Sequence, residues 1–306
     1  MPSWQSSFVD RLRHMGRPKG ATADTDIAEL RRHYAYLSDR FGAPPRDAKF
    51  EPAQVGPLKG EWVRVGNASP GRVILYFHGG GYIAGSPETH RALVARLVQA
   101  SDAAAFVLDY RLAPEFAFPA AVRDGIDAYR HLLARGTPPQ SIVFAGDGSG
   151  GGLAFSVLHA ARNANLPMPA ACAVMSPWAD LSLSGFSVLQ NGKSDNALNW
   201  ELLFLSARHY LRKNNPCDPY ASPVFASFKD FPPLMVHAGS QEMLRDDASR
   251  IGDRAADANV PVSVEIYDGM QHLFQGSRHV PEAKVSLQRL GQFIRARTGA
   301  QQNAAQ

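Results

Sequence analysis

The sequence has few cysteines, no cluster of basic residues and no long apolar run, and each lack excludes a class of protein. Only Cys172 and Cys217 occur among the 306 residues, which excludes a disulfide scaffold and suits a reducing cytoplasm. No apolar stretch approaches the roughly 18 residues that a membrane span needs. The basic residues behind the formal net charge of +4 are scattered, so we expect no nucleic-acid partner.

Metal-binding spacings are also missing. The ten histidines include no His-Glu-x-x-His pair, and the cysteines form no Cys-x-x-Cys pair. We therefore expect no metal site and no cofactor. What is present is an ordinary soluble composition, 45% hydrophobic and 20% charged.

One further lack is a single hydroxyl group. Residues 146–151 read Gly-Asp-Gly-Ser-Gly-Gly, after the apolar run 142–145 and before the helix-like stretch Leu153–Arg162. This strand–turn–helix setting is typical of a nucleophile elbow, with the pattern Gly-x-Ser-x-Gly. At its central position stands Gly148, which has no side chain to attack a substrate.

Apolar runs alternate with helix-like stretches through the rest of the chain. This alternation predicts an α/β fold with a doubly wound, mostly parallel sheet flanked by helices. An antiparallel hairpin over residues 52–66, turning near Pro57–Gly60, precedes it. The expected strands are Arg72–Phe77, Ala104–Leu108, Ser141–Ala145, Ala170–Met175, Leu234–His237 and Val262–Tyr267. The expected helices are His90–Ala100, Ala120–Leu133, Gly151–Arg162, Asn199–Leu211, Arg245–Ala258 and Pro281–Arg297.

The connection between the strands that end at Met175 and begin at Leu234 is too long for a simple crossover. Long insertions in compact domains are commonly lids or binding elements. We therefore predict a cap insertion at 183–214 and N-terminal cap helices at 1–45. The core takes 46–182 and 215–297, and 298–306 forms a flexible tail.

A glycine-rich turn follows the first parallel strand. Residues 78–82 read His-Gly-Gly-Gly-Tyr, and three glycines let the backbone turn sharply and direct its N–H groups at one point. Acyl transfer needs such donors where charge develops on the carbonyl oxygen. A plain turn is the alternative, whereas a phosphate loop is disfavoured because no Gly-Lys-Ser/Thr follows.

A histidine and a carboxylate complete the candidate site. His272 lies on a loop after the last strand, in the chain order that a hydrolase triad requires. Glu242, Asp246 and Asp247 compete as its partner. We favour Glu242, nearest the carboxyl end of its strand, because capping and the helix dipole explain the two aspartates at a helix start.

In order along the chain, these motifs resemble the hormone-sensitive-lipase-like esterases, bacterial family IV. The resemblance implies an α/β-hydrolase fold with a helical cap, and it covers roughly residues 50–297. It also implies short- to medium-chain acyl ester substrates or lactones, and a homodimer near Val262–Tyr267 and Pro281–Arg297. The segments that carry it are His78–Gly81, Asp109–Glu115, Gly146–Gly151, Ser176–Leu181 and Asp218–Pro223, with Glu242 and His272.

The resemblance also assigns roles to individual residues. It places the serine nucleophile at Gly148, and the oxyanion-hole N–H groups at Gly79, Gly80 and Ser149. Aromatic side chains of the two cap segments and of the glycine-rich turn are the candidates for the substrate-binding wall. They are Phe8, Tyr34, Phe41, Tyr82, Trp200 and Phe204.

Three interpretations of Gly148 compete. Ser149 could act instead, but one helical step turns a side chain by roughly 100° and directs it away from His272. A natural pseudoenzyme that binds a small molecule would be free to lose Glu242 and His272, yet both are present. We favour the third interpretation, a serine-to-glycine variant of an active esterase with a Ser-Glu-His mechanism.

Overall fold

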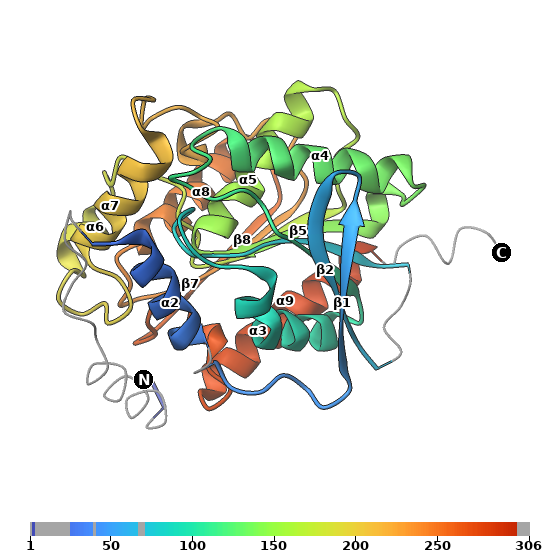
Figure 1. Cartoon of the computed structure of the whole chain (residues 1–306), viewed down its shortest axis with the longest axis horizontal. Coiled ribbons are helices and arrows are strands. Elements are labelled where there is room, and N and C mark those ends of the chain that lie inside the picture. Colours follow the sequence, from blue (N-terminus) through green and yellow to red (C-terminus); the bar gives the residue numbers. More distant parts are fainter. Residues whose placement is uncertain (1, 4–24, 39–40, 67–70, 299–306) are drawn as a thin grey trace.

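The central feature of the fold is an eight-stranded sheet in the order β1-β2-β4-β3-β5-β6-β7-β8. The computed structural model describes residues 2–3, 25–38, 41–66 and 71–298 (Figure 1). Strand β2 pairs antiparallel with β1, as the predicted hairpin requires, and also with β4. The remaining pairs are parallel, as predicted. The strands are β1 Ala48–Val55, β2 Leu58–Val65, β3 Val73–Phe77, β4 Ala104–Leu108, β5 Ile142–Asp147, β6 Ala171–Met175, β7 Leu234–Gly239 and β8 Val262–Tyr267.

Helices connect the parallel strands, and their ends differ from the expected ends by a few residues. The α-helices are α2 Ile27–Ser38, α3 Pro87–Ser101, α4 Ala120–Ala134, α5 Ser149–Asn163, α6 Phe186–Gln190, α7 Trp200–Leu211, α8 Arg245–Asp257 and α9 Pro281–Thr298. Three short 3-10 turns are η2 Pro139–Ser141, η3 Pro223–Phe225 and η4 Phe274–Gly276. Helix α3 begins before the expected His90 because Ser86 caps it and accepts the Thr89 N–H at 3.2 Å. No helix of the described residues is long and apolar enough to cross a membrane.

Apolar side chains cover both faces of the sheet. Strand β3 is buried at all five positions. Leu75 and Phe77 belong to the apolar layer that includes residues of α4, α5 and α8, whereas Ile74 and Tyr76 belong to the layer beside α3 and α9. Because successive residues point to opposite faces, a strand covered on both sides must be apolar throughout. Each such side chain contributes about 1.5–3 kcal/mol when fully buried.

Helices α2, α6 and α7 gather at one end of the molecule (Figure 1, left). The insertion is tied to the loops after β7 and β8, because Ser187 donates its hydroxyl to Met243 O at 2.6 Å and Asn196 N–H donates to Gln271 Oε1 at 3.0 Å. From α2, Arg31 donates to Ile83 O at 2.8 Å. The segments predicted to form a cap therefore contact the loops that carry the candidate site.

Candidate active site

The elbow is built as the sequence predicts. Strand β5 ends at Asp147 and α5 begins at Ser149, so Gly148 alone makes the turn, with φ 50° and ψ −122°. This left-handed backbone favours glycine. Two residues on, a Cβ at Gly150 would lie 2.0 Å from Phe77 O, so only glycine fits where α5 crosses β3.

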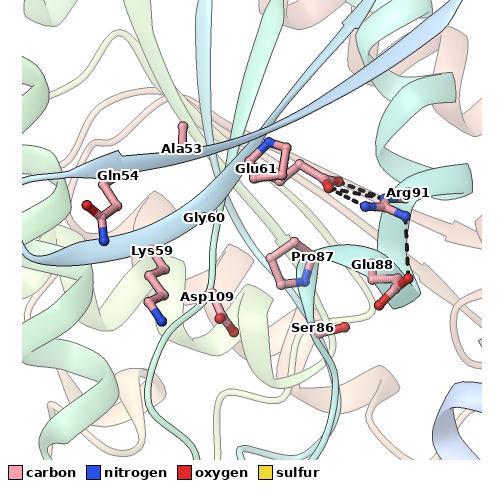
Figure 2. Close-up of a pocket in the computed structure, with 11 residues that line it drawn as sticks. Ala53, Gln54, Lys59, Gly60, Glu61, Ser86, Pro87, Glu88, Arg91 and Asp109 are labelled. Atoms are coloured by element: carbon pink, nitrogen blue, oxygen red, sulfur yellow. Dashed lines mark hydrogen bonds and ion pairs between the residues drawn. The ribbon is translucent and has the colours of Figure 1, made fainter.

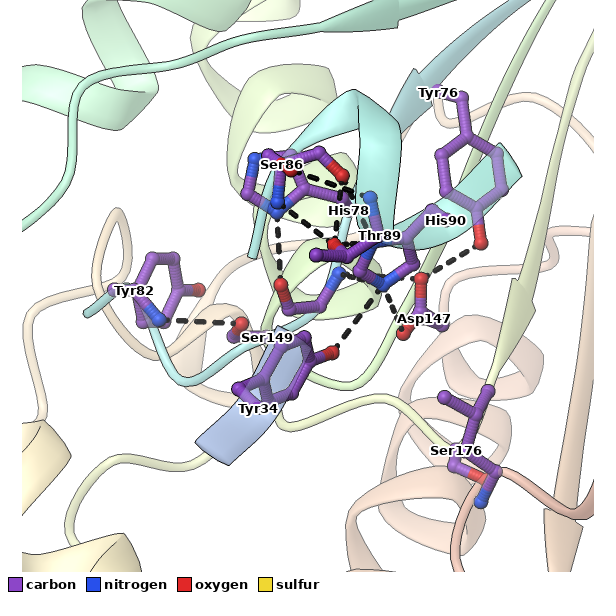
Figure 3. A network of polar contacts seen from close by, with 12 residues as sticks. Tyr34, Tyr76, His78, Tyr82, Ser86, Thr89, His90, Asp147, Ser149 and Ser176 are labelled. Atoms are coloured by element: carbon purple, nitrogen blue, oxygen red, sulfur yellow. Dashed lines mark hydrogen bonds and ion pairs between the residues drawn. The ribbon is translucent and has the colours of Figure 1, made fainter. Parts of the chain in front are cut away.

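Gly148 faces His272. A Cβ at residue 148 would lie 3.5 Å from His272 Nε2 and 3.8 Å from Cε1. A side chain placed there would therefore have its next atom within reach of the imidazole. Ser149 turns elsewhere, because its hydroxyl oxygen accepts the Tyr82 N–H at 3.3 Å (Figure 3).

The other ring nitrogen of His272 binds Glu242. The Nδ1–Oε2 distance is 2.8 Å, Glu242 is fully buried, and the His272 side chain is 12% exposed. The second carboxylate oxygen, Oε1, accepts the Ser176 hydroxyl at 3.1 Å and the Gly239 N–H. Three hydrogen bonds thus hold the carboxylate, and the carboxylate orients the ring.

The charges around His272 favour its protonated form. Burial lowers its pKa, but the hydrogen bond and charge of Glu242, with the charges of Asp195 and Asp147, outweigh burial, and the net pKa lies above that of ordinary histidine. The ring is therefore placed to take a proton and hold it as imidazolium, as a general base must.

The two competing carboxylates have partners other than His272. Both lie in the first turn of α8, as the helix-dipole explanation expects, but the capping explanation was wrong. Helix α8 has no side-chain cap. Asp246 accepts the Ser187 N–H at 2.9 Å, and Asp247 accepts the N–H groups of Ala179 and Asp180 at 2.7 and 2.9 Å. Both carboxylates fasten other segments to α8, which sequence spacing could not reveal.

Sequence reasoning missed Asp195, a buried carboxylate of the insertion. Its Oδ2 accepts the Met243 N–H at 2.8 Å, and its Oδ1 accepts the N–H groups of Ala197 and Leu198 at 2.9 Å. Its bond to Met243 holds the loop that carries Glu242, and its charge raises the pKa of His272. The sequence signal was weak, because Asp195 stands in a polar stretch that reads as loop.

The glycine-rich turn is held by a buried network (Figure 3). Asp147 accepts the Tyr76 hydroxyl at 2.7 Å and lies 3.4 Å from His90 Nε2. Gly79 N–H donates to Asp147 Oδ1 and to His90 Nε2, both at 3.2 Å. Tyr34 of α2 stacks on His90, with its hydroxyl 3.3 Å from Nε2.

This network changes the expected donor set. We had expected the Gly79 N–H to bind a substrate oxygen. It is not free to do so, because it is already used inside the protein. In the described part of the chain, the N–H groups of Gly80 and Gly81 meet no protein acceptor. Ser149 is the first residue of α5, where N–H groups lack intrahelical acceptors. Gly80, Gly81 and Ser149 are therefore the available donors.

The residues expected to form the substrate-binding wall differ in their exposure and in their contacts. Tyr82 is 1% exposed and stacks on Tyr210 of α7 at 3.9 Å, and Phe41 packs against Gly276. Trp200 and Phe204 stack on each other at 4.8 Å, 47% and 44% exposed. Phe8 lies outside the described residues. Contact with substrate stays a prediction for all of these aromatic residues, including Tyr34.

A surface groove of about 570 Å³ lies elsewhere, between the β1–β2 hairpin and the start of α3 (Figure 2). Lys59, Ser86 and Asp109 line it, and the Arg91–Glu61 ion pair, at 2.5 Å, crosses one side. None of the candidate site residues lines this groove. Among the described residues, no group of three or more His, Cys, Asp or Glu side chains is placed to hold a metal ion.

Comparisons with known proteins identify the family of this fold. Residues 74–276 match the family described as alpha/beta hydrolase fold. An acetyl-hydrolase of Streptomyces hygroscopicus is 40% identical over 282 residues, covering 91% of this chain and 93% of that protein. An esterase of Acinetobacter venetianus is 35% identical over 247 residues, covering 80% and 81%.

Solved structures indicate the same fold over nearly the whole chain. The crystal structure of an esterase from the bacterial hormone-sensitive lipase family superimposes with a TM-score of 0.92 at 36% identity, covering 98% of this chain and 100% of that one. The α/β-hydrolase fold expected from the sequence is therefore confirmed. The chain belongs to the hormone-sensitive-lipase-like esterases of the alpha/beta hydrolase fold.

Proposed function

We propose that this chain is a carboxylic ester hydrolase whose nucleophile position is occupied by Gly148. The observation that carries the proposal is the 3.5 Å between a Cβ at residue 148 and His272 Nε2, on a ring whose Nδ1 is bound to Glu242. A serine at that position would complete the nucleophile–base–acid arrangement of acyl transfer.

In the Gly148→Ser form the mechanism has two steps. The serine oxygen attacks the ester carbonyl carbon while His272 Nε2 takes its proton, and N–H groups of Gly80, Gly81 and Ser149 bind the oxyanion. His272 then gives the proton to the leaving alcohol. Water repeats the attack on the acyl-enzyme, with His272 again as base, and Glu242 stabilises the imidazolium throughout.

The chain as it stands forms no acyl-enzyme at residue 148 and is inactive or strongly impaired. Ser149 does not replace the lost nucleophile, because its hydroxyl oxygen is bound to the Tyr82 N–H. The donors and His272 remain. Triad deletions in other hydrolases keep roughly 10³–10⁴-fold catalysis over water through such groups.

The substrates we propose are short- to medium-chain acyl esters. The acetyl-hydrolase name of one relative supports the short end of that range. We also propose a homodimer through α9 and β8, the strand at one edge of the sheet, which pairs with β7 alone among the described strands. The free thiols of Cys172 and Cys217 favour a cytoplasmic location.

The test compares hydrolysis of p-nitrophenyl butyrate by this chain and by Gly148→Ser. We expect kcat to rise on the order of 10⁶-fold with the serine, the size of the loss when a protease nucleophile is removed. A matched control, His272→Ala in the Gly148→Ser background, should return the rate to the parent level.

Two results would contradict the proposal. If both forms are inert toward a panel of short acyl esters and lactones, the site is not arranged for acyl transfer, and ligand-binding screens then test the small-molecule-binding alternative. If the parent is already fast and Ser149→Ala abolishes its activity, Ser149 is the nucleophile.

A further inference from the structure

The glycine-rich turn holds one residue in a strained conformation. Tyr82 has φ 63°, in the left-handed region that bulky residues rarely adopt. It directly follows Gly80 and Gly81, whose N–H groups are two of the available oxyanion donors. A backbone of this kind persists only where the surrounding structure fixes it. The contacts that fix the turn therefore also decide where the two donors point.

Arg31 of α2 makes one of these contacts. Its Nε donates to Ile83 O at 2.8 Å, and its Nη2 donates to Ala113 O at 3.0 Å. The Ala113 N–H in turn donates to Tyr82 O at 2.9 Å. Arg31 thus closes a ring of hydrogen bonds that joins the turn to the segment around Ala113.

Glu115 holds the guanidinium of Arg31 in place. Its Oε1 accepts a hydrogen bond from Nη1 at 2.9 Å, and its Oε2 accepts one from Nη2 at 2.7 Å, so the pair is bidentate. The side chains of Arg31 and Glu115 are 34% and 53% exposed, and ion pairs that water reaches add little to the stability of a fold. The pair therefore sets the geometry of the turn more than it stabilises the protein.

The same helix also contacts the other end of the turn. The Tyr34 hydroxyl lies 3.3 Å from His90 Nε2 (Figure 3), and the Gly79 N–H donates to the same nitrogen at 3.2 Å. Arg31 and Tyr34 stand three positions apart, which places them on one face of α2. Helix α2 is therefore linked to the turn both before and after the two donors.

We propose that Arg31 is a positioning residue for ester hydrolysis, which keeps the N–H groups of Gly80 and Gly81 directed at the substrate oxygen. The inference rests on the proposed ester hydrolase function. Oxyanion donors act on charge that develops only in the transition state. A change at Arg31 should therefore lower kcat and kcat/KM by the same factor, whereas loss of substrate binding alone would raise KM.

The experiment uses the full chain with Gly148→Ser, so that turnover of p-nitrophenyl butyrate can be measured per active site. In that background, Arg31→Gln should lower kcat and kcat/KM roughly 10²-fold, the cost of a displacement of about 1 Å in an active site. Arg31→Lys should lower them less, because one ammonium group keeps donors but cannot bridge two carbonyls and a carboxylate in a planar fork. Arg32→Gln is the matched control, since it removes the same charge from the next, exposed position of α2 and should leave both constants unchanged.

Inhibition by a trifluoromethyl ketone with a short alkyl chain gives a second readout. Addition of the serine oxygen to this ketone places a negative oxygen where the oxyanion of the ester reaction forms. Its inhibition constant should weaken by the same factor as kcat/KM falls across the Arg31 variants. A merely structural role would lower Tm and the active fraction and leave the inhibition constant of the folded molecules unchanged.

The inference is overturned if Arg31→Gln turns over ester as fast as Arg32→Gln, if it raises KM alone, or if ketone inhibition does not weaken with kcat/KM. Should Arg31→Gln not fold, Arg31→Lys and Glu115→Gln decide between the same outcomes. A folded but inactive Gly148→Ser protein refutes the proposed function and this inference with it. An active Gly148→Ser protein that tolerates Arg31→Gln refutes this inference alone.

Discussion

A side chain at residue 148 should destabilise the protein. The backbone there has φ 50° and ψ −122°, a conformation that costs a residue other than glycine about 1–3 kcal/mol. Replacing glycine also restricts the unfolded chain, and this stabilises the folded state relative to it by about 0.4–1 kcal/mol. Packing adds little, because the nearest atom to a Cβ would be 3.5 Å away. Gly148→Ala should therefore be less stable by about 1.3 kcal/mol, the difference between the midpoints of these two ranges.

Thermal unfolding at one fixed scan rate measures the effect. A change of 1 kcal/mol shifts Tm by about 2–4 °C in domains of 150–250 residues, so we expect a decrease of about 3–5 °C. Gly136→Ala is a matched control, because its φ is +85° and no atom lies within 4 Å of its Cβ position. Gly148→Ser should lie between Gly148→Ala and the parent, since its hydroxyl gains a partner in His272.

A Gly148→Ala variant that melts at or above the parent temperature, while Gly136→Ala melts lower, would refute this reasoning. The elbow would then hold an L residue without strain, and the glycine would bring no stability of its own.

Three further outcomes concern His272, Ser176 and Asp247. In the Gly148→Ser background, kcat/KM should rise with pH around the pKa of His272, which lies above that of ordinary histidine. In a pH–rate profile, Asp195→Asn should shift this rise to lower pH, because the substitution removes a charge that favours the imidazolium. Ser176→Ala should cost about 1–3 kcal/mol in urea unfolding, because Leu273 N–H, which donates to the Ser176 hydroxyl at 3.1 Å, loses its acceptor; an unchanged midpoint would contradict the contact. Burial and the charge of Asp180 raise the pKa of Asp247 to about 8, so the folded state holds this proton longer than the unfolded state and stability falls as pH rises from acid toward 8. Asp247→Asn should remove that part of the fall, and Tm curves of equal slope would count against it.

The sheet and the elbow were predictable because their determinants are local. A strand buried on both faces must be apolar at each position, as Val73–Phe77 is, and a run of that kind stands out in a sequence. The glycines at 146, 148 and 150 are also a local pattern, and they mark the tight strand-to-helix turn. Chain order then placed Glu242 and His272 in loops after β7 and β8, which neighbour each other in the sheet.

The parts that sequence reasoning missed depend on contacts between distant segments. Asp195 accepts a hydrogen bond from Met243, 48 positions away, and Gly79 donates its N–H to Asp147, 68 positions away. Neither residue carries a local pattern that predicts its partner. The two aspartates at the start of α8 were explained by a local role, helix capping, whereas their partners, Ser187, Ala179 and Asp180, lie far away in the sequence.

The most direct test of the central claim is covalent labelling with phenylmethanesulfonyl fluoride, read by intact mass and peptide mapping. The account predicts one sulfonyl adduct on the Gly148→Ser protein, at the introduced serine, and no adduct at Ser149 in either form. An adduct at Ser149 of the parent, or none on Gly148→Ser when that protein is folded, would contradict the assignment of residue 148 as the nucleophile position.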